Sequence, residues 1–217
     1  MAALAAVEAE AGKIIKTKIK KYGGKNVSMY HIKDKEFIRG KVPMTKEEIR
    51  FVSIGKMELE EDDVCLDIGG GTGSVSMEMA RFARNGKVFV IERNDEAVEL
   101  IHKNIEKFDL KNVTVIKGMA PDGLKELNTK FNKIFIGGSA GNLVEIIKYS
   151  YDNLVENGIL VLNFIVLENI STAVEELKKY DFKDVDICQL IVSKNRKVKD
   201  FNMMMAENPI YVISARK

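Results

Sequence analysis

The 217-residue sequence contains no tryptophan and only two cysteines. Two cysteines are too few for the disulfide framework of a small secreted protein. Both of them, Cys65 and Cys188, lie in strand-like runs, so we expect them to be small core residues rather than a disulfide or a metal pair. No apolar run approaches the roughly 20 residues that span a bilayer, which excludes a membrane-spanning helix. Residues 1–12 have no basic stretch typical of a secretion signal, so the cytoplasm is the expected location.

An excess of charge of one sign is also lacking, because the net charge is only +2. So small an excess does not call for a nucleic-acid partner. The absence of tryptophan and the small number of tyrosines leave no platform on which bases would stack. The positive charges nevertheless form two clusters, which either face a polyanionic substrate or are simply solvated: Lys13, Lys16, Lys18, Lys20, Lys21 and Lys25 near the start, and Lys194, Arg196, Lys197 and Lys199 late in the chain.

The length suits one α/β domain with a full core and an appended arm. Hydrophobic residues make up 46% of the chain and charged residues 30%, as in soluble globular proteins. Residues 1–32 are basic and do not fit the regular pattern that follows, so we interpret them as an N-terminal arm. This arm is either flexible or packed on another subunit or over the substrate. Residues 33–217 form the predicted domain.

A glycine-rich turn organises this domain. Residues 64–68 read as a buried parallel strand, interrupted by the carboxylate of Asp67. Gly69, Gly71 and Gly73 then supply a tight turn, and a helical pattern begins at residue 74. A strand, a glycine turn and a helix N-terminus together bring bare backbone against a ligand at the carboxyl end of a sheet.

Two acidic residues indicate which ligand this turn binds. Asp67 lies two residues before the first glycine, where it would repel the phosphates of a dinucleotide. Glu92 ends the next predicted strand, residues 88–91, where it can accept hydrogen bonds from two ribose hydroxyls. An adenosyl group with a zwitterionic amino-acid tail and no phosphate suits both acids, and S-adenosylmethionine is such a ligand. The alternatives are a nicotinamide cofactor and a turn that merely connects strand to helix.

Strands and helices alternate five times, which predicts a parallel sheet covered on both faces. Thr45 is predicted to cap a helix that ends before residue 60, with Glu48 completing the capping box. Residues 185–193 and 209–215 are predicted to pair as antiparallel strands, separated by a basic, methionine-rich loop. Ligands bind such sheets outside the carboxyl ends of the strands, so the strand exits should converge on one crevice: residues 67–73, Glu92, residues 118–121, residues 137–141 and Asn163.

These features resemble the Rossmann-like class I methyltransferase fold, which is an α/β fold with seven strands, the last one antiparallel, and helices on both faces of the sheet. The resemblance is closer to one family, the decarboxylating cobalt-precorrin-6B methyltransferases of the anaerobic cobalamin pathway. It covers about residues 33–216. The motifs that carry it are Glu-Phe-Ile-Arg at 36–39, Val-Pro-Met-Thr at 42–45, Leu-Asp-Ile-Gly-Gly-Gly-Thr-Gly-Ser-Val-Ser at 66–76, Gly-Met-Ala-Pro at 118–121, Phe-Ile-Gly-Gly-Ser-Ala-Gly-Asn-Leu at 135–143, Met-Met at 203–204 and Asn-Pro at 208–209.

The resemblance implies that the methyl group of S-adenosylmethionine passes to carbon 15 of a cobalt-containing tetrapyrrole and that an acetate at carbon 12 leaves as carbon dioxide. It also implies a homo-oligomer, a tetramer in particular. By position, the cofactor contacts would be Thr45, Asp67, Gly69, Gly70, Gly71, Thr72, Gly73, Glu92 and Ala120. Two positions depart from the family pattern. Met119 replaces a usual acid, so the polar contact near the adenine is expected to be missing or replaced by thioether packing, and Gly70 replaces a commoner cysteine, which we expect to be harmless.

The tetrapyrrole carries many carboxylates, and the sequence offers cations to meet them: Arg39, Lys41, Arg196 and Lys197. Gly137, Gly138 and Ser139 would form the floor beneath the macrocycle. His31 and His102 are expected on the surface, and no residue is assigned to the decarboxylation. Methyl transfer to a nucleophilic carbon needs alignment and a dry pocket more than a strong base.

Two other functions are compatible with this fold. One is an RNA or protein methyltransferase that uses the basic arm to bind phosphates, although the Asn-Pro-Pro-Tyr type of signature for amino-group methylation is absent. The other is a non-catalytic scaffold subunit that binds the cofactor. Strongly salt-dependent tRNA binding would favour the first, and tight cofactor binding without turnover would favour the second.

Overall fold

The computed structural model describes residues 31–217, so the predicted arm falls outside it except for its last two residues. Those two residues belong to the folded domain. Ile32 is 1% exposed, and its backbone N–H donates to Glu78 Oε1 at 2.8 Å.

The domain is built on one seven-stranded sheet in the order β3-β2-β1-β4-β5-β9-β6. Its strands are β1 (Val64–Ile68), β2 (Lys87–Glu92), β3 (Val113–Lys117), β4 (Phe131–Ile136), β5 (Leu154–Phe164), β6 (Lys183–Leu190) and β9 (Ile210–Arg216). Strands β1 to β5 pair in parallel, whereas β9 lies between β5 and β6 and is antiparallel to both. The predicted seven-stranded sheet with an antiparallel last strand is confirmed.

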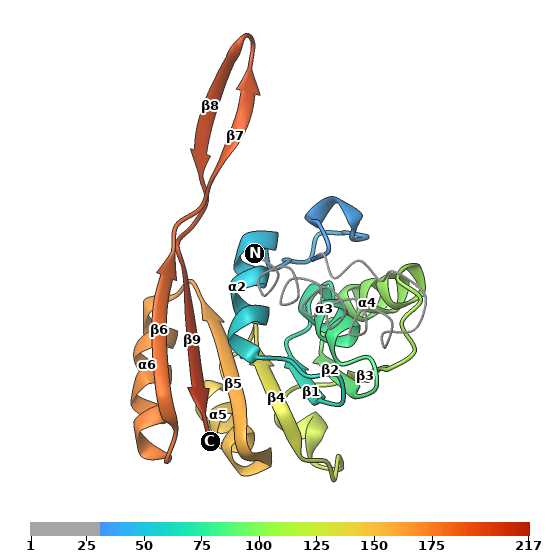
Figure 1. The fold of residues 1–217 in the computed structure, drawn as a ribbon, viewed down its shortest axis with the longest axis vertical. Coiled ribbons are helices and arrows are strands. Elements are labelled where there is room, and N and C mark those ends of the chain that lie inside the picture. Colours follow the sequence, from blue (N-terminus) through green and yellow to red (C-terminus); the bar gives the residue numbers. More distant parts are fainter. Residues whose placement is uncertain (1–30) are drawn as a thin grey trace, which may run out of the picture. The chain divides into compact units, whose positions relative to one another are not determined.

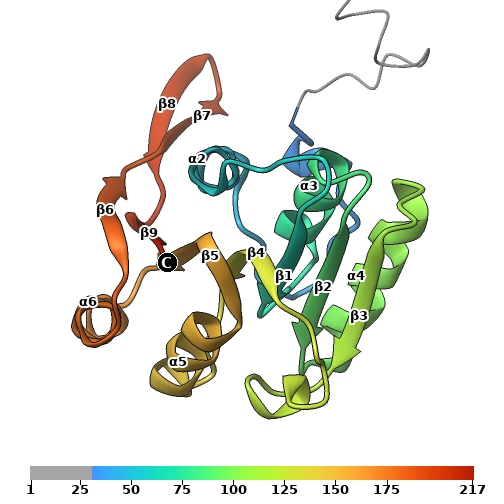
Figure 2. The ribbon, with the colours of Figure 1, turned by 60° about the horizontal axis from the view of Figure 1, so that its bottom comes forward.

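Helices cover both faces of this sheet (Figure 1). Helices α2 (Glu47–Met57), α3 (Ser74–Phe82) and α4 (Asp95–Lys107) pack on one face, and α5 (Leu143–Asn153) and α6 (Leu167–Lys179) pack on the other (Figure 2). Two short 3-10 helices, η1 (Asp34–Glu36) and η2 (Asp122–Leu124), lie in the loops. No helix within residues 31–217 is both long enough and apolar enough to cross a membrane.

Burial from both faces explains why the central strands are apolar. Side chains alternate between the two faces of a strand, so in β1 Cys65 joins the core under α2 and α3, while Leu66 and Ile68 join the core under α5 and α6. Cys65 is buried and free, as predicted, and Cys188 is also free and packs at the edge of the first of these cores. The same alternation directs Asp67 to the side of α3.

The predicted capping box at Thr45 is wrong. Lys46 precedes the first residue of α2, and no side chain caps this helix. Glu48 instead forms an ion pair with Lys194, at 3.0 Å. The Thr45 carbonyl accepts a hydrogen bond from Arg50 Nη1 at 2.6 Å, so Thr45 is fixed by its backbone while its side chain is left to the cavities described below.

The prediction of a basic, methionine-rich loop between residues 193 and 209 is also wrong, because this segment forms a β-hairpin. Strands β7 (Ser193–Val198) and β8 (Phe201–Ala206) pair with each other and project beyond the end of the main sheet (Figure 1). Nearly all hairpin residues are exposed, so no core imposes alternating polarity on them. The turn residues Lys199 and Asp200 also lack the Asn-Gly or glycine signal typical of two-residue hairpin turns.

Candidate active site

The glycine turn after β1 brings three loops together. Gly69 has φ +77°, and a Cβ there would lie 2.8 Å from the backbone nitrogen and oxygen of Gly138, in the loop after β4. Gly71 has φ +56°, and a Cβ there would lie 2.9 Å from the carbonyl oxygen of Pro43. Both positions therefore require glycine for conformation and for space. The turn is in this way packed against the loop after β4 and against residues 36–45, called here the 36–45 loop.

Glu92 closes this turn at the end of β2. Its Oε2 accepts the backbone N–H of Gly71 at 3.0 Å, and its Oε1 accepts the backbone N–H groups of Arg93 and Asn94 at 2.8 and 2.9 Å. Three backbone donors hold the carboxylate in one orientation while it remains partly exposed. A fixed anion at this strand end suits a ligand with two hydroxyl donors.

Asp67 lies behind the turn. It is 1% exposed, its Oδ2 accepts the hydroxyl of Ser76 in α3, and its Oδ1 has no hydrogen-bond partner among residues 31–217. Burial raises the pKa of Asp67 to about 7, and the nearby charge of Glu92 raises it further, whereas the bonds from Ser76 lower it. The described residues thus leave a buried carboxylate without a cation.

A cavity of about 470 Å³ opens at the carboxyl ends of β1 and β2. Six of the nine predicted cofactor residues line it: Thr45, Gly69, Gly70, Gly71, Glu92 and Ala120. The other three do not. Asp67 and Thr72 are buried, and Gly73 precedes the first residue of α3. Met119, 43% exposed, also lines this cavity, so a thioether occupies the place where the resemblance implied an acid.

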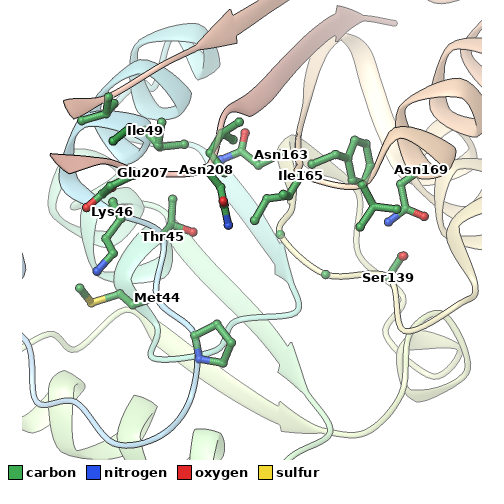
Figure 3. Close-up of a pocket in the computed structure, with 18 residues that line it drawn as sticks. Met44, Thr45, Lys46, Ile49, Ser139, Asn163, Ile165, Asn169, Glu207 and Asn208 are labelled. Carbon is green, nitrogen blue, oxygen red and sulfur yellow. The ribbon is translucent and has the colours of Figure 1, made fainter.

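A second cavity, of about 660 Å³, lies at the carboxyl ends of β4 and β5 (Figure 3). Many of its lining residues are apolar: Pro43, Met44, Ile49, Phe164, Ile165, Val166, Val192, Ala206 and Ile210. Polar side chains are interspersed among them, namely Thr45, Lys46, Ser139, Asn163, Asn169, Glu207 and Asn208. The base of the β7–β8 hairpin supplies one part of this wall, and α2 supplies another.

The two cavities meet at residues that line both of them. These shared residues are Pro43, Thr45, Gly137, Gly138 and Ser139. Thr45 and Ser139 contribute the hydroxyl groups at this junction. The two cavities are therefore adjacent, and two ligands must be adjacent if a group is to be transferred directly between them.

The predicted cations are distributed differently from expectation. Lys41 lines the first cavity, but Arg39 is exposed outside both cavities and Arg196 lies on β7, away from either wall. Lys46, which lines the second cavity, was missed by sequence reasoning. Its position in the sequence directly after Thr45, which was already predicted to contact the cofactor, could have indicated that it lies near the site. Asn163 was noted as a strand-exit residue but received no role.

A buried ion cluster holds the 36–45 loop in place. Arg50 is 0% exposed, and its guanidinium donates to the carbonyls of Thr45 and Ile32 and to the carboxylates of Asp34 (3.0 Å) and Glu78 (3.4 Å). Because α2 carries Arg50 and α3 carries Glu78, both helices fix the chain on its way to the cavity.

His31 lies beside this cluster, with a side chain that is 30% exposed. Its Nδ1 lies 3.5 Å from Glu78 Oε2, and its ring centroid lies 4.2 Å from that of Phe51. His102 is exposed, as predicted. Residues 31–217 contain no group of three or more His, Cys, Asp or Glu side chains that could hold a metal ion.

Comparison with known proteins identifies the family. The family model described as "Precorrin methyltransferase domain" matches residues 35–217. A relative from Saccharolobus solfataricus named "Probable cobalt-precorrin-6B C(15)-methyltransferase (decarboxylating)" is 40% identical over 178 residues, which is 81% of this chain and 89% of the relative.

Two solved structures are also similar. A precorrin-6y C5,15-methyltransferase from Geobacter metallireducens has a TM-score of 0.82 and 37% identity, and the match covers 89% of this chain and 100% of that one. A precorrin 8W decarboxylase from Methanobacterium thermoautotrophicum has a TM-score of 0.80 and 34% identity, over 85% and 98% of the two chains. The chain therefore belongs to the precorrin methyltransferase family.

Proposed function

We propose that this enzyme transfers the methyl group of S-adenosylmethionine to carbon 15 of cobalt-precorrin-6B and removes the carbon-12 acetate as carbon dioxide, in cobalamin biosynthesis. Family membership supports a precorrin acceptor, and the relatives' names supply the position and the decarboxylation. The structural observation that carries the proposal is the pair of cavities that meet at Thr45 and Ser139.

The first cavity has the features that S-adenosylmethionine requires. Glu92 offers a fixed carboxylate to the ribose hydroxyls, and Gly69, Gly70 and Gly71 line the cavity without side chains, which allows close backbone approach. Thr45, Gly69, Gly70, Gly71 and Ala120 complete the proposed contacts, while Asp67, Thr72 and Gly73 support the turn from behind. When bound, the cofactor supplies an electrophilic methyl group on a sulfonium centre.

The second cavity suits the macrocycle. Its apolar walls exclude water from a conjugated ring, and Lys46 offers a cation to a peripheral carboxylate. Gly137 and Gly138, which are exposed, leave room for a flat ring to approach the backbone at the junction. No histidine is found among the described residues that line either cavity. The chain's part in methyl transfer is accordingly to align the two partners and exclude water.

The test is to incubate the enzyme with cobalt-precorrin-6B and S-adenosylmethionine that carries carbon-13 in its methyl group. We expect one labelled methyl resonance assigned to carbon 15 of the macrocycle, together with stoichiometric S-adenosylhomocysteine. Label at another carbon would refute the proposed position. No label on the macrocycle, with the cofactor demonstrably bound, would refute the acceptor and favour RNA or protein substrates.

We further propose that the enzyme acts in the cytoplasm as a homo-oligomer, a tetramer in particular. Support comes from the β7–β8 hairpin, which exposes an apolar surface unusual for a monomer: Val198, Phe201, Met203, Met204 and Met205. Phe201 alone is 76% exposed. Light scattering should give a mass of several chains, and Phe201→Glu should reduce it. A monomeric wild-type protein would contradict this assembly.

A further inference from the structure

One polar side chain in the wall of the second cavity is held in a fixed orientation by the protein. Asn163 lies at the carboxyl end of β5, and its Nδ2 donates to Ser53 Oγ in α2 at 2.8 Å. Ser53 is fully buried, and its hydroxyl is 2.8 Å from the Ile49 carbonyl but 3.2 Å from Asn163 Oδ1. The single hydroxyl hydrogen therefore points to Ile49, and Ser53 accepts from Asn163.

This arrangement leaves part of the Asn163 amide for a ligand. A carboxamide has two N–H donors, and only one of them is used by Ser53. Asn169 and Asn208 line the same cavity, but their side chains form no hydrogen bond to another residue in the part of the chain that the structure describes. Asn163 is thus a donor oriented in advance, whereas its two neighbours must be ordered by whatever binds.

The chemistry of losing carbon dioxide favours such a donor over a cation. A buried cation stabilises a carboxylate and so opposes its conversion to neutral carbon dioxide. A neutral amide directs the group without cancelling its charge, and apolar walls make the charged form less favourable. Ile49, Phe164 and Ile165 supply apolar walls in the same cavity as Asn163, and Lys46 lies apart from it on the wall (Figure 3).

We propose that Asn163 binds the acetate carboxylate that the enzyme removes and that Ser53 positions Asn163 for this task. The proposal rests on the function proposed above. In the reaction the bond between the acetate methylene and its carboxyl carbon breaks, the electron pair passes into the conjugated ring, and carbon dioxide leaves. The methylene carbon then takes up one proton from water to become a methyl group. No oxidant or reductant is needed, because the electron pair released by the carboxylate ends in the new C–H bond.

The experiment measures carbon dioxide release from cobalt-precorrin-6B at saturating substrate and S-adenosylmethionine, for wild type, Asn163→Ala and Ser53→Ala. We expect release at saturating substrate to fall by about tenfold or more in Asn163→Ala, because the carboxylate is no longer held in the orientation in which its bond breaks, and by a smaller factor in Ser53→Ala. Cofactor affinity should stay within about threefold of wild type, because Asn163 does not line the first cavity. Asn128→Ala is the matched control, because it removes an exposed amide that lines neither cavity, and it should retain release within about threefold.

Two results would overturn the inference. One is carbon dioxide release in Asn163→Ala that stays within about threefold of wild type. The other is a loss that raising the substrate concentration restores, since this would reveal a defect of binding only. Thermal unfolding of each variant tests whether it is folded. Asn163→Gln keeps the amide but displaces it by one methylene group. We expect carbon dioxide release to remain impaired in Asn163→Gln, which would show that the position of the amide matters as well as its presence. If the wild-type enzyme itself neither methylates the macrocycle nor releases carbon dioxide, the proposed function fails instead.

Discussion

Asp67 is a buried carboxylate that the folded protein must accommodate without a cation among the described residues, and replacing it should stabilise the ligand-free enzyme. Asp67→Asn keeps the size of the side chain and an oxygen that can accept the hydroxyl of Ser76. It removes the charge whose burial is unfavourable. Only one side-chain oxygen is replaced, by an NH2 group. We therefore expect the variant to be more stable than wild type in neutral and alkaline solution.

The sign and the size follow from proton linkage. The folded-state pKa of about 7 exceeds the ordinary value of 3.8, so the folded protein binds the proton more tightly than the unfolded chain does. Wild type then loses stability as the pH rises from about 4 to about 7, whereas Asp67→Asn has no such group. The pKa difference corresponds to an advantage of about 4 kcal/mol for the variant above pH 7, and to almost none near pH 4.

The assay is denaturant unfolding of both ligand-free proteins at several pH values between about 5 and 8. Other carboxyls, such as Asp63, whose pKa is also raised by burial, titrate in both proteins and cancel in the difference. The difference in free energy of unfolding should grow in favour of the variant up to about pH 7 and level off above it. A difference that stays constant within about 1 kcal/mol would refute a buried, ionising Asp67.

Three further substitutions test the turn and the loop beside it. Gly69→Ala should destabilise the fold by about 2–4 kcal/mol in thermal or denaturant unfolding, because the added Cβ would meet the backbone of Gly138. Gly141 also has a positive φ but lies in open space, so Gly141→Ala should cost only about 1 kcal/mol. Equal costs would contradict the close approach at Gly69. Glu92→Gln should weaken S-adenosylhomocysteine binding by about 1–3 kcal/mol in calorimetry, and unchanged affinity would remove Glu92 from the cofactor site. Arg50→Met should destabilise the domain by about 3–5 kcal/mol, because it leaves Glu78 buried without its cation. The double variant that also carries Glu78→Gln should recover much of that stability. No recovery would show that the two charges act independently.

The sequence predicted those features that depend on local pattern and strand order. Alternating apolar runs and helical spacing gave the parallel sheet, and the glycines at 69 and 71 gave the turn that holds the cavity together. Glu92 was placed by the rule that ligands lie at the carboxyl ends of parallel strands. These features follow from covalent geometry and burial, and both can be recognised in the sequence from the positions of glycines and the spacing of apolar residues.

Features that depend on packing between distant segments were not predictable. The β7–β8 hairpin has almost no buried face, so its residues carry no alternation to reveal it. Arg50 acquires its partner, Glu78, only when α2 and α3 pack together, and His31 lies near Glu78 only when the segment before α2 packs beside α3. Asp67 was expected to face the ligand, but the alternation along β1 directs its side chain toward α3.

The cations near the second cavity also show which features depend on packing between distant segments. Arg39 and Arg196 were selected for their charge and their place in the chain, but neither lines either of the two cavities described above. Lys46 does, since Arg50 holds the backbone of the residue before it and fixes where the 36–45 loop meets α2. Which surface cation meets a ligand is decided by such loop anchors, and sequence position alone does not reveal them.

The most direct test of the central claim is mass spectrometry of cobalt-precorrin-6B after incubation with the enzyme and S-adenosylmethionine. The account predicts one product whose mass has gained a methyl group and lost carbon dioxide, formed only when both enzyme and cofactor are present. A macrocycle of unchanged mass, in the presence of folded enzyme with bound cofactor, would contradict it.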